Sequence, residues 1–444
     1  MSVLRAPEGE RGAARRFLFV LLGTGGDVWP ALGVAAGLRA AGHEVEVASY
    51  AQFEPDARAA GLPFHAVGSR EEYLAQVRQP AFWTMQGPHL AMAEGGYVRL
   101  AIPRVYELVD AMRDRRPVLV CTRNAYGARF AAERHGLACV SLVYAPQQLI
   151  TEDRLPYPLN TRLVRALPRW YKRAGLRLGD RGNLDRLRPT LDALRAPLGL
   201  PPIGRLRDWL FFGSPALALY PAWYDDLGAL AADRVGQGDF VLRHVDESAA
   251  LDEPLRRFLD AGPPPVVCTL GTGIAHAAQR YAQVARALAR TGRRGLFVTP
   301  FAENVPADAG AHVLRVDYAN LATVLRRASL LIHHGGIGTA AQALRAGTPQ
   351  LTLPFAYDQA DNGDRVRRLG AGAMLEAPLP AVDDLCVAIE RACALPRGPL
   401  DALRARVQAG RGAQACIEAL EGLLAPPRPV PARRAGLAVR EAAR

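Results

Sequence analysis

The sequence predicts an α/β protein made of two successive Rossmann-like domains, each built on a parallel sheet. The chain has 444 residues, about three times a usual domain length of roughly 150. Short apolar runs alternate with longer stretches of helical apolar spacing, which is typical of buried parallel strands separated by helices. This alternation breaks off between residues 220 and 265 and then starts again, which indicates a second domain of the same kind.

Twelve apolar runs have the length of strands. Six belong to the first domain: FLFVLL, EVEVASY, PFHAV, PVLVC, ACVSLVY and ALALY. Six belong to the second: PPVVCTLG, GLFVTP, HVLRV, SLLIHH, PQLTLP and AGAML. The segments between them have helical spacing, as in ALGVAAGLRAAG, where Pro30 is expected to open a helix. The predicted segments are a flexible N-terminus (1–15), an N-terminal Rossmann-like domain (16–222), a linker (223–245), a C-terminal Rossmann-like domain (246–400), a C-terminal helix or helix pair (401–425) and a disordered tail (426–444).

Composition narrows the class of ligand. The formal net charge is +12, which favours anionic ligands such as phosphates or acidic lipid head groups. The charge comes almost wholly from arginine beside abundant alanine, which indicates a GC-rich genome, so we expect no nucleic-acid partner. Twelve basic and four acidic residues lie between Asn160 and Leu210, interleaved with Leu, Trp and Tyr. This segment suits peripheral contact with a membrane, and a solvated helical face explains it equally well.

Cysteine usage and the N-terminal residues predict the compartment. The six cysteines form no CxxC pair and no Cys-His cluster, which argues against a zinc site and a disulfide framework. The run FLFVLLG is too short for a signal sequence or a membrane span, and no run of eighteen apolar residues occurs. We expect a cytoplasmic protein, attached at most to the inner face of the membrane.

The first predicted strand leads into a glycine turn, GTGGD, that ends in Asp27. Ligands of open parallel sheets bind beyond the carboxyl ends of the strands, so this turn faces a cleft. Gly25 and Gly26 allow the backbone to approach a ligand closely, but the turn matches neither GxGxxG nor a P-loop. Asp27 has two interpretations: an N-cap of the following helix, or a general base that reaches a substrate hydroxyl.

A second glycine turn follows the strand SLLIHH. His334 and the N–H groups from Gly336 to Thr339 are expected at a helix N-terminus, which carries partial positive charge and unpaired donors. The Thr339 hydroxyl adds a donor, so the turn suits a diphosphate. The turn TLGTG, which contains Thr272, could cover the other side of the same diphosphate.

The next predicted strand, QLTLP, brings Asp358 and Gln359 to the same edge of the sheet. A carboxylate accepts two O–H bonds and an amide both donates and accepts, so the pair can read neighbouring sugar hydroxyls. Taken singly, His334 is more simply a structural histidine, and an Asp-Gln pair is usually a solvated turn. Their joint spacing with Gly336 and Thr339 favours a diphosphate site beside a polyol site, which describes a nucleotide sugar.

This spacing resembles the donor-binding signature of the nucleotide-sugar-dependent glycosyltransferases of family one, which have the two-domain GT-B fold. The opening GTGGDVWPALGVAAGLRAAGHEV is similar to that of the bacterial members, and the likeness covers most of residues 16–425. Within the family, segments such as LYPAWYDD and HVLRVDYANLATVL resemble the catalytic rhamnosyltransferases of rhamnolipid synthesis. Plant members have a histidine near the position of Asp27, oriented by an aspartate, and no such dyad is found here, so Asp27 would act alone.

The resemblance implies two Rossmann-like domains whose parallel sheets face a central cleft, with a C-terminal helix that packs back across it. It implies inverting transfer of a hexose, rhamnose or glucose, from a nucleoside-diphosphate sugar to a hydroxyl of a small lipophilic acceptor. That acceptor would be a hydroxy fatty acid, a glycolipid or a natural product, and no metal or other cofactor would be required. The implied site residues are Asp27 as general base, Gly25 and Gly26 in the acceptor-side loop, His334, Gly336, Gly338, Thr339 and Thr272 on the donor diphosphate, Asp358 and Gln359 on the donor sugar, and Tyr318 against the nucleoside.

Other functions stay open. A nucleotide-sugar 2-epimerase shares this architecture but needs no acceptor, and a catalytically inactive homologue would act as the activating partner of another glycosyltransferase. A nicotinamide oxidoreductase fits least, since neither half has GxGxxG followed by an acid about twenty residues on. The sequence leaves open whether the donor carries UDP or dTDP, which sugar and acceptor are used, and the oligomeric state.

Overall fold

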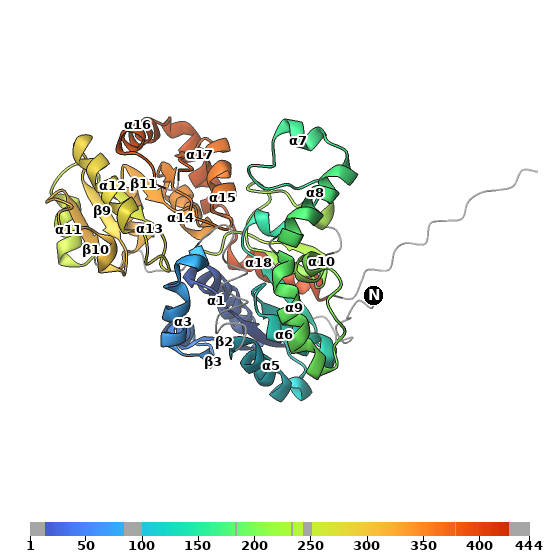
Figure 1. Ribbon diagram of the computed structural model, residues 1–444. Helices are drawn as coiled ribbons and strands as arrows, with labels where there is room; N and C mark the ends of the chain where they lie inside the picture. The colour runs from blue at the N-terminus through green and yellow to red at the C-terminus, as the bar shows by residue number, and fades with distance from the viewer. Residues whose placement is uncertain are drawn as a thin grey trace, which may run out of the picture.

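The computed structural model describes residues 14–83, 100–182, 184–231, 234–242, 251–377 and 379–425. Nearly all of the predicted flexible N-terminus (1–15), the whole predicted tail (426–444) and part of the predicted linker lie outside the described residues. The described residues form two lobes, each containing one parallel sheet (Figure 1). The predicted α/β class with two Rossmann-like domains is therefore confirmed.

The N-terminal sheet has seven parallel strands in the order β3-β2-β1-β4-β5-β6-β7. These strands are β1 (Arg16–Val20), β2 (Glu44–Tyr50), β3 (Phe64–Gly68), β4 (Val118–Cys121), β5 (Cys139–Val143), β6 (Ala216–Ala218) and β7 (Val235–Gln237). The first six coincide with the predicted runs. The sequence assigned the range of β7 to the linker (223–245), and this part of the assignment is wrong because β7 pairs in parallel with β6. Its three residues, VGQ, contain one apolar side chain and so give no strand-like run.

The C-terminal sheet has six parallel strands in the order β10-β9-β8-β11-β12-β13. These strands are β8 (Val266–Thr269), β9 (Gly295–Val298), β10 (Val313–Val316), β11 (Leu330–His333), β12 (Gln350–Thr352) and β13 (Gly372–Met374). All six coincide with predicted runs. The four inner strands are fully buried, as expected for parallel strands between helices, whereas the edge strands β10 and β13 are mostly half-buried.

Helices cover both sheets. In the N-terminal half they are α1 (Gly25–Ala40), α2 (Glu54–Ala59), α3 (Arg70–Val77), α5 (Ile102–Ala111), α6 (Tyr126–His135), α7 (Arg162–Ala166), α8 (Arg169–Gly182), α9 (Arg188–Arg195) and α10 (Leu206–Phe212). In the remainder they are α11 (Glu253–Asp260), α12 (Ala278–Arg290), α13 (Leu321–Val324), α14 (Ile337–Ala346), α15 (Gln359–Arg368), α16 (Val382–Cys393), α17 (Arg397–Gln408) and α18 (Ala413–Leu423).

Strand order places the loops that matter for function. The chain moves outward in opposite directions from β1 and β4 in the first sheet, and from β8 and β11 in the second. Such a switch point leaves a crevice beyond the carboxyl ends of the two central strands, because the connecting helices leave on opposite faces. The glycine turn after β1 and the one after β11 both leave such strands.

The two domains share packed side chains. One apolar cluster combines Val143 and Tyr220 of the N-terminal half with Ala340, Leu344 and Leu400 of the C-terminal half. Burying these side chains together removes apolar surface from water and so holds the domains against each other.

The segment of residues 401–425, for which a helix or a helix pair was predicted, belongs to two helices, α17 and α18. The first packs on α14 of the C-terminal domain, whereas the second packs on α1 and β7 of the N-terminal domain (Figure 1). Cys416, Ile417 and Leu420 of α18 are buried in the N-terminal core. The last described helix therefore belongs physically to the first domain.

Candidate functional site

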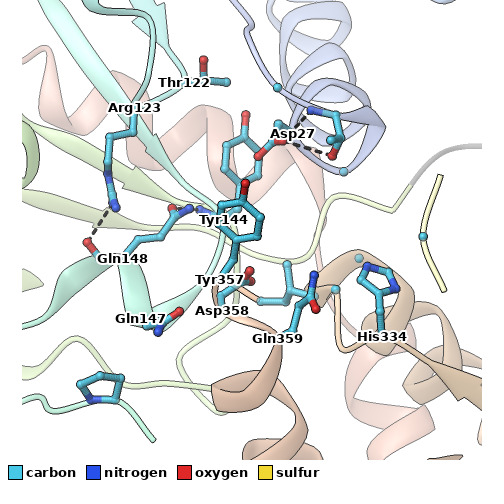
Figure 2. A pocket seen from close by; sticks show the side chains of 18 of the residues that line it. Asp27, Thr122, Arg123, Tyr144, Gln147, Gln148, His334, Tyr357, Asp358 and Gln359 are labelled. Carbon is cyan, nitrogen blue, oxygen red and sulfur yellow. Dashed lines mark hydrogen bonds between the residues drawn. The ribbon is translucent and has the colours of Figure 1, made fainter. Parts of the chain in front are cut away.

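A cavity of about 1020 Å³ opens between the two domains. Its walls include the turns after β1 and β4 of the N-terminal sheet and those after β8 and β11 of the C-terminal sheet. Figure 2 shows how side chains from both domains lie around it. All the predicted site residues line this cavity: Gly25, Gly26, Asp27, Thr272, Tyr318, His334, Gly336, Gly338, Thr339, Asp358 and Gln359.

Asp27 lies in the first turn of α1, which begins at Gly25 rather than at Pro30. The N-cap is Thr24, and its N–H donates to Asp27 Oδ2 at 2.8 Å while its hydroxyl donates to the same oxygen at 3.3 Å. Asp27 is thus the third helical residue of a capping box, not the N-cap itself. The turn needs glycine at Gly23, which has φ 145° and whose Cβ would lie 2.4 Å from Asp27 Oδ2.

The environment makes Asp27 a stronger base than an ordinary aspartate. Burial raises the pKa of Asp27 to about 6, and the hydrogen bonds from Thr24 oppose this shift. The carboxylate is therefore still mostly ionised at neutral pH. A pKa nearer the working pH is what proton abstraction requires.

The turn after β11 is shaped around the His334 ring. A Cβ on Gly336 would lie 2.5 Å from His334 Nε2, and one on Gly271 of the opposite turn would lie 3.3 Å from its Cε1. Gly336 is the N-cap of α14, so the first N–H groups of that helix have no partner within it. Burial lowers the pKa of His334 to about 4, so the ring is neutral at pH 7 and acts as a hydrogen-bonding group, not as a cation.

Asp358 is held by Asn362, a residue one helical turn further on. Asn362 is fully buried, and its amide nitrogen donates to Asp358 Oδ2 at 2.7 Å and to the main-chain oxygen of Gly335 at 2.9 Å. One side chain thus ties the acid to the glycine turn. Burial raises the pKa of Asp358 to about 6, the bond from Asn362 opposes the shift, and the charge of Asp27 adds to it. The two carboxylates are therefore close enough to repel each other.

The Gln359 side chain has fewer hydrogen-bonding atoms left for a ligand than the sequence analysis predicted. Its amide oxygen accepts from the N–H groups of Phe355 at 2.7 Å and Ala356 at 3.1 Å, which shapes the loop after β12. The expectation that this amide both donates and accepts toward a sugar is therefore corrected. Only the amide nitrogen is left as a donor for a ligand.

Several residues of the cavity wall were not found from the sequence. Tyr357 has φ 58°, rare for a residue with a Cβ, and its hydroxyl donates across the domains to the main-chain oxygen of Phe82. Its ring meets Trp83 edge to face, with ring centroids 6.0 Å apart. Tyr144 and Arg123 also line the cavity. Only the position of Tyr357, directly before the acid-amide pair, was a signal in the sequence.

The N-terminal side of the cavity is largely apolar. The arginine-rich segment contributes to it through α8 and α10, which turn Leu176, Leu210 and Phe211 toward the cavity. Arg173 and Arg177 of α8 are exposed and lie outside that lining. The segment thus contributes apolar side chains to the cavity, while the arginines of α8, together with Trp170 and Leu178, face solvent.

Two features are absent from the part of the chain that the structure describes. No group of three or more His, Cys, Asp or Glu side chains in this part of the chain is arranged to hold a metal ion. No helix among these same residues is long and apolar enough to cross a membrane.

Two Rossmann-like domains that face each other across such a cavity define the GT-B fold. The spinosyn rhamnosyltransferase SpnG, solved with thymidine diphosphate, superposes with a TM-score of 0.62, covering 91% of this chain and 100% of that chain at 20% sequence identity. The GT-B architecture expected from the resemblance is therefore confirmed.

Sequence comparison defines the family. Residues 17–138 match the glycosyltransferase family 28 N-terminal domain, and residues 301–416 match the erythromycin biosynthesis protein CIII-like C-terminal domain. Glycosyltransferase GtfC of Amycolatopsis orientalis is 30% identical over 390 residues, which cover 85% of this chain and 90% of GtfC. The vancomycin aglycone glucosyltransferase of the same organism is 28% identical over 384 residues, with the same coverage. The chain belongs to the GT-B glycosyltransferases of family one, and it is a glycosyltransferase. The finer resemblance to the rhamnosyltransferases of rhamnolipid synthesis stays a prediction.

Proposed function

We propose that this enzyme transfers a hexose, rhamnose or glucose, from a nucleoside-diphosphate sugar to a hydroxyl of a lipophilic acceptor, with inversion at the anomeric carbon. The observation that carries the proposal is that Asp27, Asp358 and the N-terminus of α14 line one cavity from two domains. Two similar proteins support this substrate class. One is a glucosyltransferase of the vancomycin aglycone, and the other is a spinosyn rhamnosyltransferase that was solved with thymidine diphosphate.

Asp27 is assigned the role of general base. The acceptor hydroxyl loses its proton to Asp27 as its oxygen attacks the anomeric carbon, and the nucleoside diphosphate leaves from the opposite face. With a pKa of about 6, Asp27 is still a weak base toward an alcohol, so the proton moves late, while the C–O bond forms. General-base catalysis of this kind contributes roughly 10²- to 10⁴-fold.

The α14 N-terminus is assigned to the leaving diphosphate. Its free N–H groups and the partial positive charge of the helix meet the charge that grows on the leaving oxygen. The Thr339 hydroxyl and the Gly338 N–H lie in the same turn, and Thr272 lies in the turn after β8 on the other side. His334, being neutral, contributes a hydrogen bond. These donors supply the stabilisation for which other enzymes use a metal ion, so the proposal includes none.

The remaining residues are assigned to the sugar and the nucleoside. Asp358 accepts from sugar hydroxyls and the amide nitrogen of Gln359 donates to one. Tyr318 is half exposed and lines the cavity, and its ring is assigned to stack on the base, whether uracil or thymine. The apolar N-terminal wall receives the acceptor. Peripheral contact with a membrane is assigned to α8, whose exposed Trp170 and Leu178 lie beside exposed arginines.

Donor binding tests this proposal. UDP, TDP, UDP-glucose and TDP-rhamnose, without added metal, would be titrated by calorimetry into the wild type, His334→Ala and a control, His312→Ala, whose ring lies outside the cavity. We expect micromolar binding of one nucleotide series, weakened roughly 10- to 100-fold in His334→Ala by loss of a hydrogen bond worth about 1.5–3 kcal/mol, and unchanged in His312→Ala.

The two alternative functions, an inactive activating homologue and a nucleotide-sugar 2-epimerase, predict different results with the same compounds. If none of the four compounds binds, the nucleotide-sugar site is refuted and the inactive activating homologue is favoured. If the wild type converts the donor sugar with no acceptor present, the 2-epimerase is favoured instead.

A further inference from the structure

Arg123 lies in the cavity wall on the N-terminal side, in the loop between β4 and α6. Its guanidinium stacks on the Phe211 ring, with Cζ 3.9 Å from the ring centroid. One N–H, on Nη2, donates to the main-chain oxygen of Gln148 at 2.8 Å (Figure 2). The Nε atom is shielded from solvent and has no hydrogen-bond partner among the described residues. Arg123 therefore reaches the cavity with most of its five donors uncommitted.

No described carboxylate balances the charge of Arg123. Arg207, which also lines the cavity, is paired with Asp180, its Nε donating at 2.8 and 2.9 Å. Arg129 is buried without an acid, but it donates to two main-chain oxygens at 3.1 Å and to the Ser141 hydroxyl. In the part of the chain that the structure describes, Arg123 has no acid partner, and its one hydrogen bond is the one to the main-chain oxygen of Gln148.

This charge stays in place at neutral pH. Burial, together with the charges of Arg129 and Arg207, lowers the pKa of Arg123 to about 9, so the guanidinium remains protonated. A charge taken out of water without a counter-ion is costly for the fold. A ligand that brings a negative charge to this wall would recover that cost on binding.

The site of Arg123 belongs to the acceptor side of the cavity. The strands β1 and β4 are neighbours, with Val20 opposite Cys121. The Leu22 N–H donates to the Thr122 hydroxyl at 2.9 Å, which ties the loop that carries Arg123 to the end of β1. Arg123 thus lies at the same sheet edge as Asp27, whereas the helix N-terminus assigned to the donor diphosphate lies on the other domain.

We infer that Arg123 binds an acidic group of the acceptor, a carboxylate or a phosphate, while Asp27 addresses the acceptor hydroxyl. This inference rests on the proposed function and narrows its substrate class to amphiphiles that combine an apolar body, a free hydroxyl and an acid. A planar guanidinium meets the two oxygens of such a group at once, and the apolar wall around it keeps water from competing. Arg123 is then the residue that selects acids over neutral acceptors.

The test compares acids with their neutral counterparts. Decanoic acid, methyl decanoate and decyl phosphate would be titrated at pH 7.5 into the wild type, Arg123→Gln and a control, Arg39→Gln, which removes the same charge from an exposed position. We expect the wild type and the control to bind an acid at least 10-fold more tightly than the ester, and Arg123→Gln to lose this preference. The tighter of the two acids identifies the group as carboxylate or phosphate. Equal binding of acids and ester by the wild type, including no binding of any, overturns the inference, as does a preference that survives in Arg123→Gln.

Nucleotide binding measured on the same samples separates this inference from the proposed function. Arg123→Gln is expected to bind UDP or TDP as the wild type does, which also shows that it is folded. If Arg123→Gln does not fold, Arg123→Lys is expected to prefer acids less strongly than the wild type does. Lysine keeps the positive charge but lacks the planar guanidinium that donates two parallel hydrogen bonds. A wild type that binds no nucleotide refutes the proposed function, whereas one that binds nucleotide without preferring acids refutes the inference alone. Loss of nucleotide binding in folded Arg123→Gln would assign Arg123 to the donor and overturn the inference.

Discussion

The substitution Asp27→Asn is expected to lower the turnover of the enzyme and at the same time to raise the stability of the fold. The substitution keeps the size of the side chain and an oxygen that can accept from the Thr24 N–H, and it removes the charge. If Asp27 is the base, turnover falls roughly 10²- to 10⁴-fold while donor binding stays intact. The same change should also stabilise the fold at neutral pH, because the raised pKa means that ionised Asp27 is unfavourable in the folded state.

The size and pH range of this gain follow from the pKa. The folded-state pKa of about 6 lies above the ordinary aspartate value of 3.8, and this difference of about two pH units corresponds to about 3 kcal/mol as an upper bound. Because Asp27 is partly exposed to the cavity, about 1–2 kcal/mol is the realistic figure. Protonated Asp27 contributes fully below pH 3.8, and its contribution is lost as the pH rises to about 6. Asp27→Asn should match the wild type near pH 4 and exceed it in stability at pH 8.

Urea unfolding followed by tryptophan fluorescence at these two pH values measures both quantities. Asp308→Asn, at an exposed position, is the control for the change in net charge. A variant Asp27→Asn that is less stable than the wild type at pH 8, or a gain that is the same at both pH values, would refute the reasoning about burial. Turnover close to that of the wild type would remove Asp27 from the mechanism.

Three further outcomes are expected. Arg365→Met should cost about 3–5 kcal/mol in urea unfolding, because Arg365 pairs with the buried Asp361 at 2.9 Å and its loss leaves that carboxylate without its ion pair, whereas Asp225 keeps its pair with Arg154; a cost below about 1 kcal/mol would contradict this. Gly335→Ala, at φ 96° and with its Cβ 2.4 Å from the main-chain oxygen of Gln359, should destabilise the fold and weaken nucleotide binding in calorimetry, and unchanged affinity would count against the tight turn. The specificity constant kcat/KM should rise with pH through an apparent pKa of about 6, which belongs to the coupled carboxylates of Asp27 and Asp358 together. A value of kcat/KM that is constant from pH 5 to 8 would argue against a carboxylate general base with this pKa.

The sequence predicted the fold better than it predicted the contacts of the site. Twelve strands were found because buried parallel strands are apolar on both faces, and β7 was missed because VGQ is not. Pro30 suggested the start of α1, but the helix begins five residues earlier, where Thr24 and Asp27 close a capping box. The apolar spacing of a sequence does not show that a proline is tolerated inside a helix.

The site contacts depend on residues that meet only in three dimensions. Asn362 follows Asp358 by one helical turn, which could have suggested their hydrogen bond, but its second bond to Gly335 joins segments far apart in the chain. Arg123 is one of many arginines in this sequence, and no local pattern says which of them lacks an acid. That distinction requires the positions of all the carboxylates around it.

The placement of α18 has a consequence for protein engineering. A hybrid enzyme that combines the acceptor half of this chain with the donor half of a relative would normally be made by one cut in the linker. Because α18 follows the C-terminal domain in sequence but packs in the N-terminal core, one cut would give the acceptor half a foreign helix against α1. A second junction between α17 and α18 would keep each core with its own side chains, and such three-piece hybrids should express as folded protein more often than two-piece ones.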